Sequence, residues 1–199
     1  MSAPDMQPAP LDLPESDIRY FPTFFDSETA TGYFETLRAK VPWQQDPITL
    51  FGKTYWQPRL TALYADNGKS YTYSGITMHP KPFGPVLLEI KSQVEAAVGS
   101  VFTTCLLNKY RDGSDSNGWH ADNEKELGRN PVIASVSLGG VRSFHLKHRK
   151  KRQWRHKMAL HHGSLLLMQG TTQHYWLHQV PKTKKPVGER INLTFRYIA

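Results

Sequence analysis

Two histidines and one aspartate are the residues in this chain best suited to hold a metal ion. His120 and Asp122 are one residue apart in the segment WHADNE, and His178 follows in the segment YWLHQVP. On an extended backbone, side chains two residues apart project to the same side, so His120 and Asp122 can act together. Two histidines and a carboxylate form the facial triad of non-haem Fe(II) oxygenases, which leaves coordination positions open for a cosubstrate and O₂. We therefore consider an iron site.

An isolated His-x-Asp triplet also arises by chance, and nine histidines allow other combinations. His174 and His178 are spaced for one face of a helix, but residues 175–177 favour a strand, and His174 is not followed by the Glu of a zinc-protease motif. His161 and His162 are adjacent, would face opposite sides of a strand, and are interpreted as structural. The four histidines in loops or basic stretches are interpreted as surface residues: His79, His145, His148 and His156.

The last predicted strand, RINLTFRYI over residues 190–198, alternates apolar and polar side chains. Its apolar face consists of Ile191, Leu193, Phe195 and Tyr197. Its polar face consists of Arg190, Asn192, Thr194 and Arg196. An ordinary half-buried strand would turn this polar face to water. Alternatively, the face lines a polar cavity for a small anion, because the arginine guanidinium presents a planar fork suited to a carboxylate.

An earlier strand, CLLNKY, carries two more polar groups on one face. Asn108 and Tyr110 are two residues apart at the end of an apolar run. If this strand and the RINLTFRYI strand face one cavity, their polar side chains form a donor-rich pocket for a dicarboxylate.

Two helices precede the strands that carry these groups. Asp26 or Ser27 can cap a helix with a helical apolar period that Pro42 ends. A second helix begins at Pro85 and ends at Gly99, a natural C-terminal cap. From residue 101 the pattern favours short strands, in the segments VFTTCLLNKY, VIASVSLGG, RSFHLKH, GSLLLMQ and RINLTFRYI. Helices followed by many strands predict an α+β fold with a jelly-roll or small-barrel core.

Composition narrows the setting. The 199 residues suffice for one good-sized domain, and residues 1–17 contain four prolines and read as a flexible tail. No apolar run exceeds four residues and the N-terminus lacks a signal pattern, so we expect neither a membrane span nor secretion. Cys105 is the only cysteine, which fits a reducing compartment. The net charge of +8 favours a polyanionic partner, most commonly nucleic acid.

The sequence carries, in this order, the Asn-x-Tyr pair, the His-x-Asp pair, His178 and the Arg-x-Asn-x-Thr-x-Arg strand. In this combination it resembles the AlkB family of Fe(II)/2-oxoglutarate dioxygenases. The resemblance runs from about Phe51 to the C-terminus through LLNKYRDGSDSNGWHADNE, PVIASVSLGG, RSFHLKH, HHGSLLLMQG, YWLHQVPK and ERINLTFR. The branch that contains the eukaryotic nuclear DNA-repair members is the most similar. The resemblance implies a double-stranded β-helix (jelly-roll) core over residues 101–199, N-terminal helices, and a nucleotide-recognition lid of hairpins over about 43–83, all in a single domain of residues 18–199.

The resemblance also implies a chemistry. His120, Asp122 and His178 would hold Fe(II), while Arg190 and Tyr110 would hold the distal carboxylate of 2-oxoglutarate. Four further positions match family residues around the cosubstrate: Asn108, Asn192, Thr194 and Arg196. With O₂, such an enzyme oxidises the N-methyl group of a damaged base and releases succinate, CO₂ and formaldehyde. A cytoplasmic or nucleoid location is expected for a bacterial protein and a nuclear one for a eukaryotic protein.

Substrate contacts are implied for two segments and one pair. In SYTYSG, Tyr73 would stack on a flipped 1-methyladenine or 3-methylcytosine, and Tyr71 and Thr72 would complete the lid; a plain aromatic hairpin is the alternative. In LFGK, Phe51 would be the wedge that enters the base stack, Gly52 the turn and Lys53 a phosphate contact. After the metal aspartate, many family members have a second acid where this chain has Asn123, followed by Glu124, near the base edge.

Basic segments would contact the phosphate backbone. Residues 147–157 hold seven Lys or Arg in an exposed loop or hairpin, and residues 182–185 add a second group. The partner is expected to be alkylated DNA bound by a monomer. Two alternatives remain open at this point: the same chemistry on methylated RNA, and a non-catalytic, basic nucleic-acid-binding jelly roll.

Replacing Phe51 distinguishes duplex from single-strand substrates. Because a wedge is useful only in a base stack, Phe51→Ala should reduce the demethylation rate on duplex DNA more than on a single strand. Parallel kinetics on paired and unpaired methylated oligonucleotides measure this. Equal losses on both substrates would count against the wedge.

Overall fold

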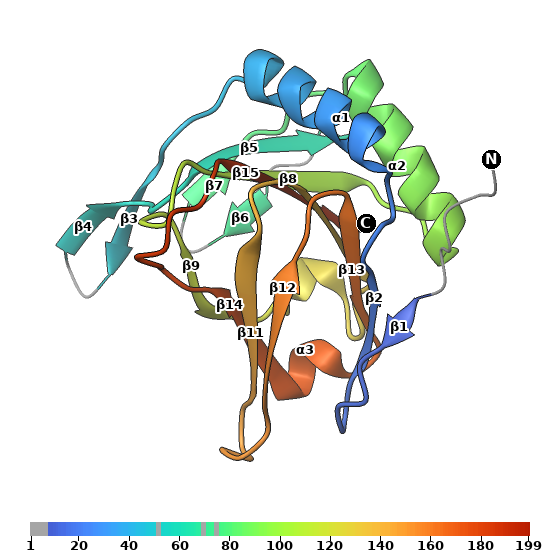
Figure 1. Ribbon diagram of the computed structural model, residues 1–199, viewed down its shortest axis with the longest axis vertical. Helices are drawn as coiled ribbons and strands as arrows, with labels where there is room; N and C mark the ends of the chain where they lie inside the picture. Colours follow the sequence, from blue (N-terminus) through green and yellow to red (C-terminus); the bar gives the residue numbers. More distant parts are fainter. Residues whose placement is uncertain (1–7, 51–52, 69–70, 74–75) are drawn as a thin grey trace.

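Most of the fold is two antiparallel sheets that face each other (Figure 1). The structure, a computed structural model, describes residues 8–50, 53–68, 71–73 and 76–199. The larger sheet has the strand order β1-β2-β13-β10-β15-β8-β5 and the smaller one β12-β11-β14-β9. This arrangement confirms the predicted jelly-roll core. None of the described helices is long and apolar enough to span a membrane.

The strands have the following bounds. The larger sheet contains β1 (Ala9–Pro10), β2 (Asp17–Phe21), β13 (Ser164–Gln169), β10 (Ile133–Gly139), β15 (Arg190–Arg196), β8 (Thr104–Tyr110) and β5 (Leu60–Ala65). The smaller sheet contains β12 (Arg155–Leu160), β11 (Arg142–His148), β14 (Trp176–Val180) and β9 (Asn117–His120). Two separate hairpins are β3 (Pro47–Leu50) with β4 (Lys53–Trp56), and β6 (Tyr71–Tyr73) with β7 (Ile76–Met78).

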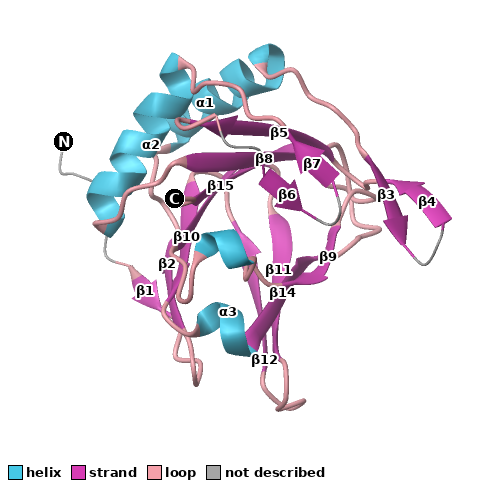
Figure 2. Ribbon diagram, turned by 180° about the vertical axis from the view of Figure 1, so that it is seen from behind, coloured by secondary structure: helices cyan, strands magenta, loops and turns pink. Residues whose placement is uncertain are grey.

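Two long helices cover the outer face of the larger sheet (Figure 2). Helix α1 (Ser27–Lys40) begins where the Asp26 side chain accepts a hydrogen bond from the Thr29 N–H at 2.8 Å. Helix α2 (Pro85–Val98) has proline in its first turn and ends at Gly99, whose φ of 67° suits glycine. Both helices confirm the sequence prediction. The short helices are α3 (Thr172–Tyr175) and a 3₁₀ turn at Lys125–Leu127.

Alternation along the strands divides the interior into two clusters. One cluster joins the helices to the outer face of the larger sheet, with Leu193 and Phe195 of β15 at 0% exposure. The other fills the space between the sheets, with Leu166 of β13 opposite residues such as Phe144 of β11. Because neighbouring side chains of a strand point to opposite faces of the sheet, one strand can contribute side chains both to the cluster under the helices and to the space between the sheets.

Several expectations about segment boundaries are wrong. Strand β5 lies in the larger sheet, so residues 60–65 of the predicted lid belong to the core. Residues 9–17 of the expected tail are ordered: β1 pairs with β2, and the Pro14 carbonyl accepts a hydrogen bond from the Trp176 indole at 2.9 Å. Strand β15 ends at Arg196, and Tyr197 is exposed rather than in line with the apolar face. Tyr175 belongs to helix α3, together with His174, rather than to the predicted strand, which begins at Trp176.

His148 is a further correction, because it is buried rather than at the surface. Its ring stacks on Tyr175 and its Nε2 lies 3.0 Å from a carboxylate oxygen of Glu15. The basic segment 147–157 forms the hairpin that joins β11 to β12, the second of the two forms expected. His148 is drawn inward because its end of the hairpin packs against the N-terminal segment.

Removing apolar volume from β15 should destabilise the whole domain. Leu193→Ala is expected to lower the free energy of unfolding by about 2–5 kcal/mol, because a fully buried leucine leaves a cavity. Denaturant unfolding measures the change. Leu88→Ala on α2 is the matched control, since Leu88 is 46% exposed and should cost less than about 1 kcal/mol. Equal losses in the two variants would contradict this division of β15.

Candidate metal and cosubstrate site

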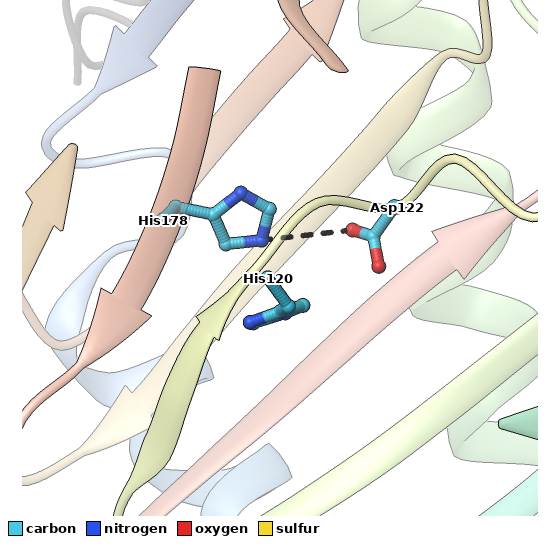
Figure 3. Close-up of side chains that lie close together, drawn as sticks. All are labelled: His120, Asp122 and His178. Carbon is cyan, nitrogen blue, oxygen red and sulfur yellow. Dashed lines mark ion pairs between the residues drawn. The ribbon is translucent and has the colours of Figure 1, made fainter. Parts of the chain in front are cut away.

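The predicted metal ligands meet at the open edge of the smaller sheet (Figure 3). His120 ends β9 and lies directly opposite His178 of β14, and Asp122 follows two residues after His120. One ligand atom of each residue lies within 4.8 Å of those of the other two. Among the residues that the structure describes, this is the group of His, Cys, Asp and Glu close enough to bind a metal ion. Strand pairing therefore brings the two histidines together, and the His-x-Asp spacing brings the aspartate to them.

Burial keeps both imidazoles neutral. Desolvation lowers the pKa of His178 to about 3, and the nearby His120 contributes while Asp122 opposes the change. Desolvation likewise lowers the pKa of His120. A neutral imidazole offers the lone pair that a metal ion requires, so both histidines are in the form that binds metal.

Asp122 is held ionised by its neighbours. Burial alone would raise its pKa, but Arg196 and then the two histidines outweigh burial and lower the pKa to about 2. The Arg196 guanidinium donates to Asp122 Oδ1 at 2.6 Å, and Asp122 Oδ2 lies 3.8 Å from Nε2 of His178. One carboxylate oxygen is thus anchored by arginine while the other faces the histidines.

Backbone and amide groups orient the ligands. Nδ1 of His120 lies 2.7 Å from the Gly118 carbonyl oxygen, and donation there leaves Nε2 with its lone pair. The Asn117 amide nitrogen lies 3.3 Å from that Nε2. The Asp122 N–H donates to the Gln173 side-chain oxygen at 2.9 Å, and Gln173 is fully buried. Gln173 was not predicted, because nothing in its local sequence distinguishes it from an exposed polar residue.

The polar face of β15 lines the same cavity as the ligands. Arg190 and Asn192 lie opposite Tyr110 and Asn108 of β8 in the sheet register. The alternative of a face turned to water is wrong, because the four polar side chains of β15 are 1–7% exposed. The predicted cavity residues all line it: Asn108, Tyr110, Arg190, Asn192, Thr194 and Arg196.

Arg190 presents hydrogen-bond donors to this cavity. Its Nη2 donates to the Ser137 hydroxyl at 2.9 Å, but Nε and Nη1 are buried and have no hydrogen-bond partner among the residues that the structure describes. Burial lowers its pKa. The Tyr110 ring lies 5.1 Å from the Arg190 guanidinium carbon and 5.4 Å from that of Arg142. Because an unpaired buried cation is costly, this end of the cavity fits a carboxylate.

The two asparagines are tied into the cavity wall. The Asn192 amide donates to the Ser135 hydroxyl at 2.8 Å and accepts from the Thr194 hydroxyl at 3.0 Å. The Arg59 Nε donates to the Asn108 side-chain oxygen at 2.8 Å. Arg59 is 5% exposed and also lines the cavity. It precedes β5, and the apolar run of that strand was the signal that could have located it.

The structure describes only part of the predicted substrate contacts, and Lys53, Asn123 and Glu124 are not among the described residues that line this cavity. Phe51 and Gly52 lie outside the described residues, while Lys53 begins β4 and is exposed. The backbone of Tyr71–Tyr73, which includes Thr72, forms β6 and pairs with β7. Asn123 is exposed. Glu124 is half-buried, and its buried Oε2 has no hydrogen-bond partner within the described ranges of the chain.

Comparison with known proteins supports one family. Residues 17–196 match the model of the 2OG-Fe(II) oxygenase superfamily. The chain is 44% identical over 186 residues to the alpha-ketoglutarate-dependent dioxygenase alkB homolog 3 of Bos taurus, covering 89% of this chain and 64% of that protein. It is 40% identical to the DNA oxidative demethylase ALKBH2 of Mus musculus, covering 88% of this chain and 73% of that protein.

A solved structure shares the fold. The structure of OsALKBH1 superposes with a TM-score of 0.68 at 17% identity, over 96% of this chain and 100% of that one. The chain spans 64–66% of the length of the alkB homolog 3 proteins that it matches. With a metal triad and an anion-binding strand in one cavity, and these similarities across almost its whole length, the chain belongs to the AlkB homologues of the 2OG-Fe(II) oxygenase superfamily.

Proposed function

We propose that the protein removes N-methyl groups from 1-methyladenine and 3-methylcytosine in DNA, and so repairs alkylation damage directly. The observation that carries this proposal is a half-buried to buried His-Asp-His group that shares one cavity with guanidinium donors of Arg190 that have no partner among the described residues. The names of the relatives support it: one is an alpha-ketoglutarate-dependent dioxygenase and another a DNA oxidative demethylase.

The donor set suits Fe(II), because two neutral imidazoles and one carboxylate leave positions for other ligands. His120, Asp122 and His178 would hold the ion. Fe(II) with 2-oxoglutarate and O₂ supplies the oxidation that hydroxylates the N-methyl carbon, after which formaldehyde leaves the base and succinate and CO₂ remain. Arg196 keeps Asp122 ionised and fixes one of its oxygens, so the ligand set is oriented before a metal ion binds.

The far end of the cavity orients the cosubstrate. Arg190 can donate from Nε and Nη1 to the distal carboxylate of 2-oxoglutarate, and Ser137 fixes the guanidinium for that contact. The Tyr110 hydroxyl is the second donor in this assignment. Asn192 and Thr194, already bonded to protein groups, form the wall that keeps the dicarboxylate in place.

The substrate base must leave the duplex to reach a cavity inside the protein. Methylation at the pairing edge weakens the base pair, which lowers the cost of extrusion. Tyr73, with Tyr71 and Thr72, would cover the extruded base. The unpartnered oxygen of Glu124 can accept a hydrogen bond from an exocyclic amino group at the base edge.

Basic segments suit the phosphate backbone of DNA, and equally that of RNA. The chain carries 25 Lys and Arg against 17 acids, and seven of the basic residues lie on the β11–β12 hairpin segment 147–157. A non-catalytic binding module accounts for this charge but not for the buried site. Two buried arginines and a buried, ionised aspartate are costly to fold, so binding alone gives no reason to keep them.

The metal triad is tested by removing one ligand. His120→Ala should abolish the release of formaldehyde and succinate from a 1-methyladenine oligonucleotide and weaken Fe(II) binding, because two ligands hold the ion poorly. His161→Ala is the matched control, since His161 is exposed and is not among the described residues that line the cavity. Activity that survives in His120→Ala would remove His120 from the iron site. No turnover by the unaltered protein with Fe(II), ascorbate and 2-oxoglutarate would refute the function itself.

The anion site is tested at Arg190. Arg190→Met removes the charge at similar volume and should raise the KM for 2-oxoglutarate by about 100-fold, the value of two charge-assisted hydrogen bonds, with the KM for the oligonucleotide little changed. Steady-state kinetics with each substrate varied in turn measure both constants. Arg38→Met on the surface of α1 serves as the control. An unchanged KM for 2-oxoglutarate would place the distal carboxylate elsewhere.

A further inference from the structure

Trp119 lies next to a metal ligand but on the other side of its strand. In β9, His120 and Asn117 line the cavity, whereas the Trp119 side chain is 38% exposed. Strand β9 is the edge strand of the smaller sheet, and Figures 1 and 2 both show it beside the β3–β4 hairpin. A large aromatic ring is therefore presented to solvent directly across one strand from the cavity.

Two side chains of β11 accompany this ring. The Lys147 ammonium lies 4.3 Å from the centre of the Trp119 ring, and the His145 ring lies 6.5 Å from it at an angle of 45°. Since β14 separates β9 from β11, the three side chains share one face of the sheet across β14. We call Trp119, His145 and Lys147 the Trp119 platform.

Basic residues adjoin the Trp119 platform. Lys157 of β12 lies opposite His145 in the register, and Lys147 begins the segment with seven basic residues. An exposed aromatic ring within a cationic face is the combination that binds single-stranded nucleic acid, through base stacking and phosphate contacts. A lone ammonium over an exposed ring stabilises less than a stacked base, so Lys147 can give up the ring for a phosphate.

We propose that the Trp119 platform binds the nucleotide next to the extruded one, with its base stacked on Trp119 and its phosphate on Lys147. The proposal rests on the proposed function, in which the substrate is a nucleic-acid strand. It extends that function because it gives the flanking nucleotide its own site. A nucleic-acid strand that delivers one base to the His120 side of β9 passes over the edge of β9. The nucleotide next to the extruded one then reaches the Trp119 side.

Binding without turnover tests the stacking. Fluorescence anisotropy of a labelled, unmodified single-stranded oligonucleotide, with Fe(II) and 2-oxoglutarate omitted, measures the Kd. Trp119→Ala and Trp119→Leu should each weaken binding about tenfold or more, and Trp119→Phe should retain most of it. Tyr197→Ala is the control, because Tyr197 is an exposed aromatic beyond β15. Unchanged binding in Trp119→Ala and Trp119→Leu would overturn the proposal.

Salt dependence tests the phosphate contact separately. Lys147→Gln should reduce the slope of log Kd against log salt by about 0.7, the value for one phosphate on a single strand. Trp119→Ala should leave the slope unchanged. A slope that does not respond to Lys147→Gln would overturn the Lys147 assignment.

A double-mutant cycle distinguishes stacking from a structural effect of Trp119. An oligonucleotide with one 1-methyladenine is compared with versions that carry an abasic residue on either side of it. On one flank, the abasic residue and Trp119→Ala should each weaken binding, and together should cost little more than either alone. Additive losses on both flanks would overturn the stacking. Coupled binding without formaldehyde release under complete conditions would uphold the Trp119 platform and refute the demethylation.

Discussion

An ionised carboxylate inside the protein is the constraint on which the site depends. Asp122 is almost fully buried, and burial opposes its charge until Arg196 donates to it at 2.6 Å. That pairing requires a guanidinium between two sheets, and β15 supplies it because alternate residues of β15 face the cavity. The other residues of the strand pack against α1 and α2, so the helices stabilise the strand that holds the aspartate in its charged form.

Arg190 shows the complementary case. It is as deeply buried as Asp122, yet two of its nitrogens have no hydrogen-bond partner in the described part of the chain. Arg196 is therefore paired with a carboxylate inside the fold, whereas Arg190 bonds to the Ser137 hydroxyl and, in our proposal, turns its other donors to a ligand. The same strand thus carries the cation that pairs with Asp122 and, six residues away, the cation that we propose binds the cosubstrate, and its register against β8 keeps both fixed.

The sequence correctly predicted the features that depend on the pattern of residues within one short segment. The alternation of residues 190–196, the capped helix after Asp26 and the His-x-Asp spacing all gave correct positions, since each depends on the geometry of a short segment. Residues fixed by distant contacts were missed. Gln173 matters only because Asp122, 51 residues earlier in the chain, donates to it. The burial of His148 likewise depends on Glu15.

The position of His120 and His178 on paired strands has a consequence for how the protein assembles. Strand β9 has one neighbour in its sheet, β14, and the register shifts between His178 and Val180. A metal ion bound by both histidines would link β9 to β14 across this short, irregular strand pairing. Iron binding would then order this edge of the smaller sheet as well as prepare the chemistry, so the same edge would be less ordered in the iron-free protein.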